Sequence, residues 1–204
     1  AGVTRDDLIR AADSAMYRAK QRPGLSCEIA EPVEPDREVM RLRFHQDLHR
    51  GLANAEFVLH FQPQYDLRSG DAVALEALLR WRRGGGDPLP PADFVSALED
   101  TGLIVEVGRW VLAAACLQAR QLHERGSRIR VAVNLSPVQF AAGGLIDDVL
   151  AALAESGLGP DFLELEMTER TLMGDTLAVN ETLAALKNAG IRLTIDDFGT
   201  GYAS

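Results

Sequence analysis

Ile191-Arg192-Leu193-Thr194-Ile195-Asp196-Asp197-Phe198-Gly199-Thr200-Gly201-Tyr202 is the stretch from which we interpret the chain. Every second residue from Ile191 to Ile195 is apolar, which is the period of a strand with one buried face. The strand ends at two adjacent carboxylates, Asp196 and Asp197, and a loop with two glycines follows. Unpaired carboxylates are costly to bury, so we expect this pair to be solvated, hydrogen-bonded or neutralised by a cation. An ordinary loop with a solvated Asp-Asp pair is the simple alternative.

Four earlier runs repeat the alternation of an apolar and a polar face: Phe57–Gln62, Ala74–Trp81, Val131–Leu135 and Phe162–Thr168. Amphipathic helical segments are expected between most of them, roughly at 91–100, 105–125, 144–156 and 171–189. Strands that alternate with helices predict a parallel α/β sheet. The first two runs are joined only by a short connection at 67–71 and should instead form an antiparallel hairpin.

Polar residues gather toward the C-terminal ends of these predicted strands, where parallel α/β folds place their functional groups. They are Glu76, Asn134, Glu166, Asp196 and Asp197. Four carboxylates and an amide at one rim repel one another unless cations lie among them, and hard oxygen ligands suit Mg²⁺ or Mn²⁺. The two adjacent aspartates could serve two ions, the layout for in-line attack on a phosphodiester.

Two further polar residues share these faces and could contact an anionic substrate. Arg80 lies on the face of Glu76 and can hold a phosphate through charge-assisted hydrogen bonds, and Gln62 could add a neutral donor. Structural alternatives stay open for several positions. Glu76 could be a core acid paired with Arg80, Asn134 could cap the following helix, and Glu169 could be a solvated loop acid.

Composition limits the classes of function. The 204 residues carry a net charge of −9 with a pI near 4.9, which argues against binding a nucleic-acid polymer through a basic surface. Cys27 and Cys116 match no metal spacing and indicate a reducing compartment. The sequence holds no apolar run of membrane-spanning length. We expect a cytoplasmic segment, with a membrane anchor elsewhere in its parent left open.

Four ordered motifs resemble those of EAL-domain cyclic di-GMP phosphodiesterases. They are Glu76 to Trp81 (EALLRW), Asn134-Leu135-Ser136 with Gln139-Phe140, Glu164 to Glu169 (ELEMTE) and Asp196 to Tyr202 (DDFGTGY). Phe61-Gln62-Pro63 before them, and the segments at 91–94 and 101–103 between them, fit in the same order. The match runs from about Phe44 to the end of the chain.

The resemblance implies a TIM-like (β/α) barrel of the EAL type, in which metal-activated water opens cyclic di-GMP to linear pGpG. It also implies roles for individual residues. By matching motif the metal ligands are Glu76, Asn134, Glu166 and Asp196, and Asp197 completes a second Mg²⁺ or Mn²⁺ site. Gln62 and Arg80 contact the substrate, and Glu169 holds the loop after Asp197 in its working conformation.

The N-terminal residues suggest a different unit. Ala12 to Lys20 (ADSAMYRAK) resembles the last helix of GGDEF diguanylate cyclase domains, although the signature loop is absent, and an ordinary alanine-rich helix is the alternative. Prolines among acidic residues mark a linker after it. We therefore expect a GGDEF-like helix at 1–24, a linker and the start of a connecting helix at 25–43, and the N-terminal part of an EAL domain at 44–204.

The resemblance also marks an incomplete domain. Family members continue with a lysine on the next strand, a late glutamate and a closing strand, whereas this sequence reaches about five strands at Ser204. We expect the parent protein to be a phosphodiesterase and residues 1–204 alone to hydrolyse cyclic di-GMP weakly or not at all. A receptor that binds cyclic di-GMP without cutting it is the alternative. An exposed sheet edge used for assembly, including a homodimer, is a third.

Overall fold

The computed structural model describes residues 9, 12, 16, 35–168, 171 and 176–196, without the side chains of 35–38 and 176. The chain divides into two compact units, Ala1–Asp47 and Leu48–Ser204. In the first unit Ile9, Ala12 and Met16 are helical and exposed, and the remainder of the expected GGDEF-like helix lies outside the described residues. The second unit holds the sheet and the residues predicted to carry function.

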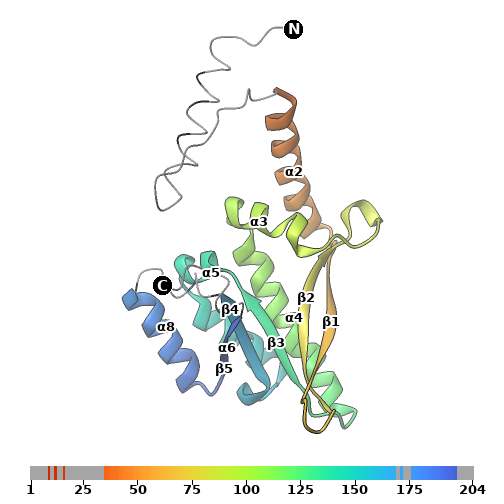
Figure 1. Cartoon of the computed structure of the whole chain (residues 1–204), viewed down its shortest axis with the longest axis vertical. Helices are drawn as coiled ribbons and strands as arrows, with labels where there is room; N and C mark the ends of the chain where they lie inside the picture. The colour runs from red at the N-terminus through yellow and green to blue at the C-terminus, as the bar shows by residue number, and fades with distance from the viewer. Residues whose placement is uncertain are drawn as a thin grey trace. The chain divides into compact units, whose positions relative to one another are not determined.

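The helices and strands follow the expected alternation, and Figure 1 shows their arrangement. In chain order they are α2 (Pro35–Ala53), β1 (Phe57–Tyr65), β2 (Ala72–Trp81), η1 (Arg83–Gly85), η2 (Pro91–Asp93), α3 (Val95–Thr101), α4 (Ile104–Glu124), β3 (Arg130–Leu135), α5 (Pro137–Ala142), α6 (Leu145–Ser156), η3 (Pro160–Phe162), β4 (Leu163–Thr168), α8 (Thr176–Asn188) and β5 (Arg192–Asp196).

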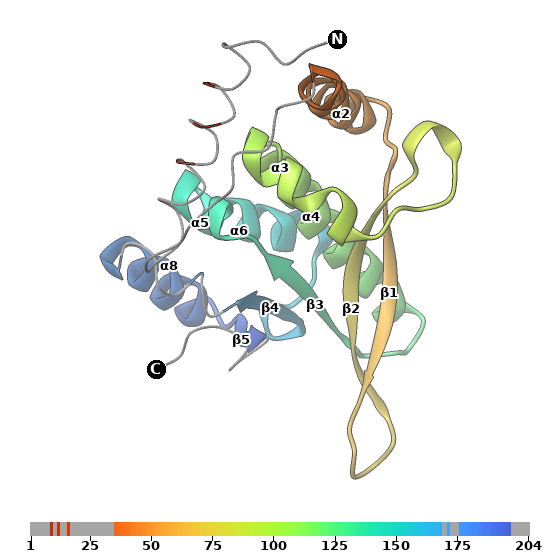
Figure 2. The same ribbon diagram turned by 45° about the horizontal axis from the view of Figure 1, so that its top comes forward.

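The five strands form one sheet in the order β1-β2-β3-β4-β5. The antiparallel β1–β2 hairpin and the parallel pairing of β2 to β5 are both confirmed. The hairpin is longer than expected and projects beyond β3 (Figure 2). Its turn is held by the Asp66 carboxylate, which accepts from the N–H groups of Arg68 and Ser69, and Gly70 supplies the left-handed φ of +77°.

The apolar residues of the parallel strands lie in register, which confirms the predicted faces. Val133 pairs with Leu165 and Leu165 with Leu193, while Leu135 pairs with Met167 and Met167 with Ile195. Helices α4, α6 and α8 follow one another and pack beside the sheet (Figure 1). Val133, Leu165 and Met167 are each at most 2% exposed. The alternate residues of these strands, which point to the other face of the sheet, therefore carry the polar side chains, as the sequence predicts.

An aromatic cluster closes the end of the hairpin. The rings of Phe57, Trp81 and Phe94 lie with each pair of centroids 5.9 Å apart, and all three side chains are buried. The indole Nε1 of Trp81 donates to Glu56 Oε2 at 3.0 Å, so its polar atom is satisfied. This cluster joins the start of β1 to the end of β2 and to the segment before α3.

The segment after β3 turns at once into the short helix α5. Ser136 is its N-cap: the hydroxyl oxygen accepts from the N–H of Val138, and Gln139 Oε1 accepts from the Ser136 N–H at 3.0 Å. Helix α4 packs against this cap at Gly108, where an added Cβ would lie 2.2 Å from Gln139 Nε2. Glycine at this position therefore lets α4 and α5 approach closely.

We predict that Gly108→Ala destabilises the fold by roughly 1–3 kcal/mol, the usual cost of overpacking a closely packed site. Chemical denaturation measures the loss. The matched background is Gln139→Ala, which removes the obstructing side chain; there Gly108→Ala should become neutral or stabilising by up to about 1 kcal/mol through helix propensity. Equal destabilisation in both backgrounds would show that the contact with Gln139 does not require glycine.

Candidate functional site

Asn134 and Glu76 meet on the polar face of the sheet. Asn134 is the penultimate residue of β3, and its Nδ2 donates to Glu76 Oε1 at 2.8 Å. This bond engages the amide nitrogen, so the carbonyl oxygen Oδ1 is available to a cation. The structure gives Glu76 this bond to Asn134 in place of the alternative pairing with Arg80, whose Nη1 donates to the Leu79 carbonyl at 2.8 Å.

The position of Glu76 differs from the expectation that it lies at the C-terminal end of its strand. It lies in the middle of β2, beside Ala132 and two residues below the level of Asn134. The reason is the hairpin, because β2 continues beyond its parallel partner to pair with β1 as far as Phe57 opposite Trp81. The Asn134 side chain therefore reaches Glu76 diagonally, from β3 to the neighbouring strand β2 and two residues back along it.

Glu166 is the buried acid of this face, with 7% of its surface exposed. It lies directly beside Asn134 in the β3–β4 register. Burial raises the pKa of the Glu166 carboxyl, the hydrogen bond from Gln64 opposes that rise, and the nearby negative charges of Glu76, Asp196 and Glu164 add to it. The site therefore holds one buried carboxylate in a field of like charge.

Gln64 is a site residue that the sequence analysis missed. Its Nε2 donates to Glu166 Oε1 at 3.2 Å, which links β1 to β4 across the polar face. Parity could have identified it, because Gln64 follows the predicted Gln62 by two residues in the same strand. Gln62 itself is exposed and pairs with Glu76 in the hairpin register, so it lies beside the acidic group. Arg80 is half-buried and lies four register pairs beyond Glu76 along β2.

Glu164 has the same parity as Glu166 but a different environment. Its carboxylate accepts from Arg130 Nε at 3.3 Å and from the Thr194 hydroxyl. These two partners occupy both carboxylate oxygens and tie β3, β4 and β5 together. Glu164 is therefore a structural acid, which agrees with its omission from the predicted ligand set.

The donor set of the polar face suits a hard divalent cation. Glu76, Asn134 and Glu166 supply oxygen ligands, and Asp196 ends β5 two register pairs beyond Thr194. Asp197 and Glu169 lie outside the described residues. Within the described part of the chain, no three His, Cys, Asp or Glu side chains are close enough to share an ion. The described acidic side chains of this face therefore supply suitable oxygen donors but do not bring three carboxylates to one point.

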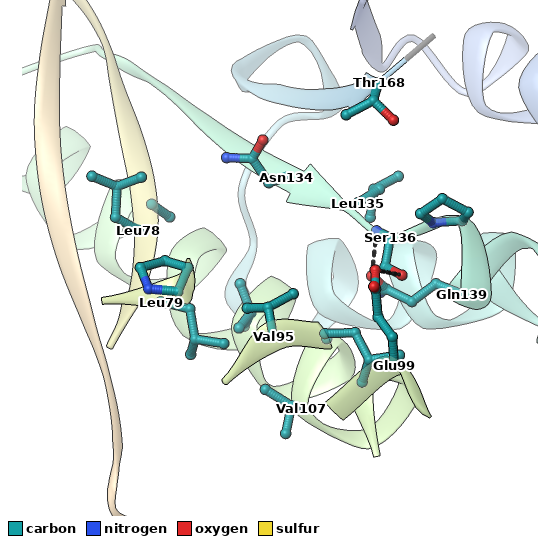
Figure 3. A pocket seen from close by; sticks show the side chains of 16 residues that line it. Leu78, Leu79, Val95, Glu99, Val107, Asn134, Leu135, Ser136, Gln139 and Thr168 are labelled. Atoms are coloured by element: carbon teal, nitrogen blue, oxygen red, sulfur yellow. Dashed lines mark hydrogen bonds between the residues drawn. The ribbon is translucent and has the colours of Figure 1, made fainter. Parts of the chain in front are cut away.

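A cavity of about 560 Å³ lies next to this face, between β2, β3 and helices α3 to α5 (Figure 3). Its wall is mostly apolar and includes Val95, Val107 and Leu135, and Asn134 and Thr168 lie at its upper edge. Glu76, Glu166 and Asp196 are not among its lining residues. The cavity therefore adjoins the carboxylates but does not contain them.

Among the described residues, no helix combines the length and the apolar character needed to cross a membrane. The thiol of Cys116 is buried and unpaired, and burial raises its pKa to about 12. Such a thiol stays protonated at neutral pH and behaves as a small apolar core residue. Cys116 therefore plays no part in the chemistry of the polar face.

Comparisons with known proteins agree on one family. The family described as EAL domain matches residues 45–204. From Pseudomonas aeruginosa, the bifunctional diguanylate cyclase/cyclic di-GMP phosphodiesterase MucR is 40% identical over all of this chain, and the cyclic di-GMP phosphodiesterase NbdA is 36% identical over all of it. The chain spans 30% and 26% of the lengths of these two relatives.

Solved structures show the same relationship. The MucR phosphodiesterase in complex with c-di-GMP superposes with a TM-score of 0.75 and 42% identity, covering 79% of this chain and 66% of that one. Structural neighbours of this kind are EAL domains with a TIM-like barrel, so the expected fold class is confirmed. The five-stranded sheet of the described residues corresponds to part of such a barrel.

We predict that Glu166→Gln raises the melting temperature of the metal-free chain, and more at pH 8 than at pH 5. A carboxyl with a raised folded-state pKa contributes stability at low pH and loses it as the pH rises through that pKa. Glutamine has no charge to bury and can still accept from Gln64. The check is thermal unfolding in a chelator at both pH values.

The matched control for this prediction is Glu164→Gln, on the same strand and face. It weakens the ion pair with Arg130, so its melting temperature should fall or stay unchanged at both pH values. If Glu166→Gln behaves like this control at pH 8, Glu166 is not a destabilising buried charge.

Proposed function

The chain belongs to the EAL domain family, and from this premise we propose that it forms part of a metal-dependent phosphodiesterase that hydrolyses cyclic di-GMP to linear pGpG. The observation that supports this most directly is the burial of Glu166 beside Asn134 and within the field of Glu76 and Asp196. A buried carboxylate among like charges is costly unless a cation neutralises it. The relatives named as cyclic di-GMP phosphodiesterases support the choice of substrate.

We assign the ion-holding role to Glu76, Asn134, Glu166 and Asp196, with Asp197 completing a second position. Oxygen ligands favour Mg²⁺ or Mn²⁺ over zinc, and two ions agree with the adjacent aspartates. Bound divalent ions would supply a hydroxide nucleophile at neutral pH and charge stabilisation at the phosphate. The remaining chemistry belongs to the protein side chains.

The protein side chains orient the ligands and the substrate. Asn134 holds the Glu76 carboxylate through its amide nitrogen, and Gln64 holds one oxygen of Glu166. These two bonds limit the rotation of both carboxylates. We propose that Arg80 and Gln62 bind the phosphate and the nucleotide, since Arg80 uses one Nη1 bond internally and has further donors. Glu169 is proposed to hold the loop after Asp197.

The N-terminal unit is proposed to be the end of a GGDEF-like domain at 1–24, followed by a linker at 25–43 and the EAL segment from 44. The alignment with MucR covers the whole chain, and MucR is named a bifunctional diguanylate cyclase/cyclic di-GMP phosphodiesterase. This arrangement agrees with a cytoplasmic signalling protein. A homodimer formed through the sheet edge is a further proposal for its assembly.

A non-catalytic receptor for cyclic di-GMP is the second candidate. It is favoured by one observation: within the described residues no three acidic, His or Cys side chains are close enough to share an ion. A receptor needs the nucleotide-binding residues but no complete ion site. The two candidates therefore differ in whether nucleotide binding and turnover require a divalent ion.

We predict that the chain binds cyclic di-GMP only when Mg²⁺ or Mn²⁺ is present, because the carboxylates of the polar face must be neutralised before a phosphate can approach. Isothermal titration in metal and in chelator measures binding, and chromatography of the nucleotide detects pGpG. Glu166→Gln should abolish the metal-dependent part of cyclic di-GMP binding. Glu155→Gln removes the same charge from an exposed position on α6 and should leave it unchanged.

Each other outcome of this experiment is informative. Metal-dependent binding with pGpG identifies an enzyme within residues 1–204. Binding that is equal in metal and chelator, without pGpG, supports the receptor. An absence of nucleotide binding under all conditions contradicts both candidates for this chain.

A further inference from the structure

We propose that Glu99 is a positioning residue for the metal site, acting through Ser136 on Asn134; this inference rests on the function proposed above. Glu99 lies on α3, outside all four motifs that carry the family resemblance. Its Oε1 accepts the hydroxyl proton of Ser136 at 2.6 Å (Figure 3). Ser136 follows Asn134 by two residues at the end of β3.

The Ser136 hydroxyl makes two bonds at once. It donates to the Glu99 carboxylate and accepts from the N–H of Val138 at 3.2 Å. A hydroxyl that donates to an ionised carboxylate forms a charge-assisted bond, which is shorter and stronger than a neutral one. Ser136 is only 8% exposed, so water competes little for this proton. The bond therefore fixes both the rotamer of Ser136 and the distance between α3 and the end of β3.

The helix cap alone does not explain the contact with Glu99. The capping box of α5 is complete without it, because Ser136 and Gln139 satisfy each other's backbone groups. Glu99 adds a link between segments 37 residues apart in the chain. Helix α4 supports the same turn from Gly108, where Gln139 leaves no room for a side chain. The turn after Asn134 is thus held by both α3 and α4.

This turn begins directly after the strand end that carries Asn134. Asn134 is exposed, and the only side-chain bond that the structure gives it among the described residues is that from Nδ2 to Glu76. The β3–β4 register places Asn134 beside Glu166, and the backbone of Asn134 to Ser136 continues from that pair to the residue that Glu99 holds. A shift of that backbone would move the amide relative to both carboxylates at once. Groups that orient ligands in this way commonly change metal affinity when they are removed.

The variant that tests the inference is Glu99→Leu. Leucine cannot accept the Ser136 proton, and the adjoining cavity lined by Val95, Ile104 and Val107 can receive an apolar side chain. We expect about 10- to 100-fold weaker Mn²⁺ binding by isothermal titration of residues 1–204. In the metal-free chain, we also expect the side-chain amide resonances of Asn134, assigned with Asn134→Asp, to shift in a ¹H–¹⁵N spectrum.

Two controls separate positioning from simple stability. Glu99→Gln keeps an acceptor for Ser136 and should restore most of the Mn²⁺ affinity and the Asn134 resonances. Asp100→Leu makes the same type of change on the next, exposed residue of α3 and should leave both readouts unchanged. Thermal unfolding of each variant shows how much stability is lost independently of the metal.

The outcomes are distinguishable from a failure of the proposed function. If the unaltered chain binds Mn²⁺ and Glu99→Leu binds it equally well with unshifted Asn134 resonances, the positioning role is overturned while the phosphodiesterase proposal stands. If Glu99→Gln binds Mn²⁺ no more tightly than Glu99→Leu, the loss of the acceptor for the Ser136 hydroxyl is not what weakens Mn²⁺ binding. If the unaltered chain binds no Mn²⁺, the metal site itself is overturned, and the inference with it.

Discussion

The burial of one carboxylate among others is the constraint on which the rest of this structure depends. Glu166 is 7% exposed; burial raises its pKa, and the negative charges of Glu76, Asp196 and Glu164 raise it further. The strands cannot move apart to relieve this repulsion, because their opposite face is packed in register through Val133, Leu165 and Leu193. Hydrophobic packing therefore holds like charges together, which is the condition that favours binding of a cation.

Two glutamates on β4 show how the same residue type acquires two roles. Glu164 and Glu166 share a face and lie two residues apart. Glu164 is neutralised within the protein by Arg130 and is tied to Thr194. Glu166 receives only a neutral hydrogen bond from Gln64 among the contacts described. The difference lies in the neighbouring strand β3, since the guanidinium of its Arg130 reaches Glu164, whereas the amide residue Asn134 lies beside Glu166.

Contacts outside the polar face support the strands that form it. The aromatic cluster of Phe57, Trp81 and Phe94 holds the hairpin that carries Glu76 and Gln64, and α4 packs closely on the Gln139 side chain of the α5 cap. These contacts concern the shape and stability of the domain. They involve Trp81 at the end of β2 and the helix that follows β3, and so they support the strands that carry Glu76 and Asn134.

Sequence alone was sufficient for the five strands, the antiparallel hairpin, the apolar and polar faces of the sheet, and the family, because each depends on local periodicity or on ordered motifs. It also named Glu76, Asn134, Glu166 and Asp196 as candidate ligands; the structure describes their positions, and their roles remain predictions, as do those of Asp197 and Glu169, which lie outside the described residues. It placed Glu76 too near the strand end and missed Gln64 and the contact from Glu99 to Ser136. Only the tertiary structure decides these, because strand register, hairpin length and bonds between segments far apart in the chain are set by packing and leave no periodic signal in the sequence.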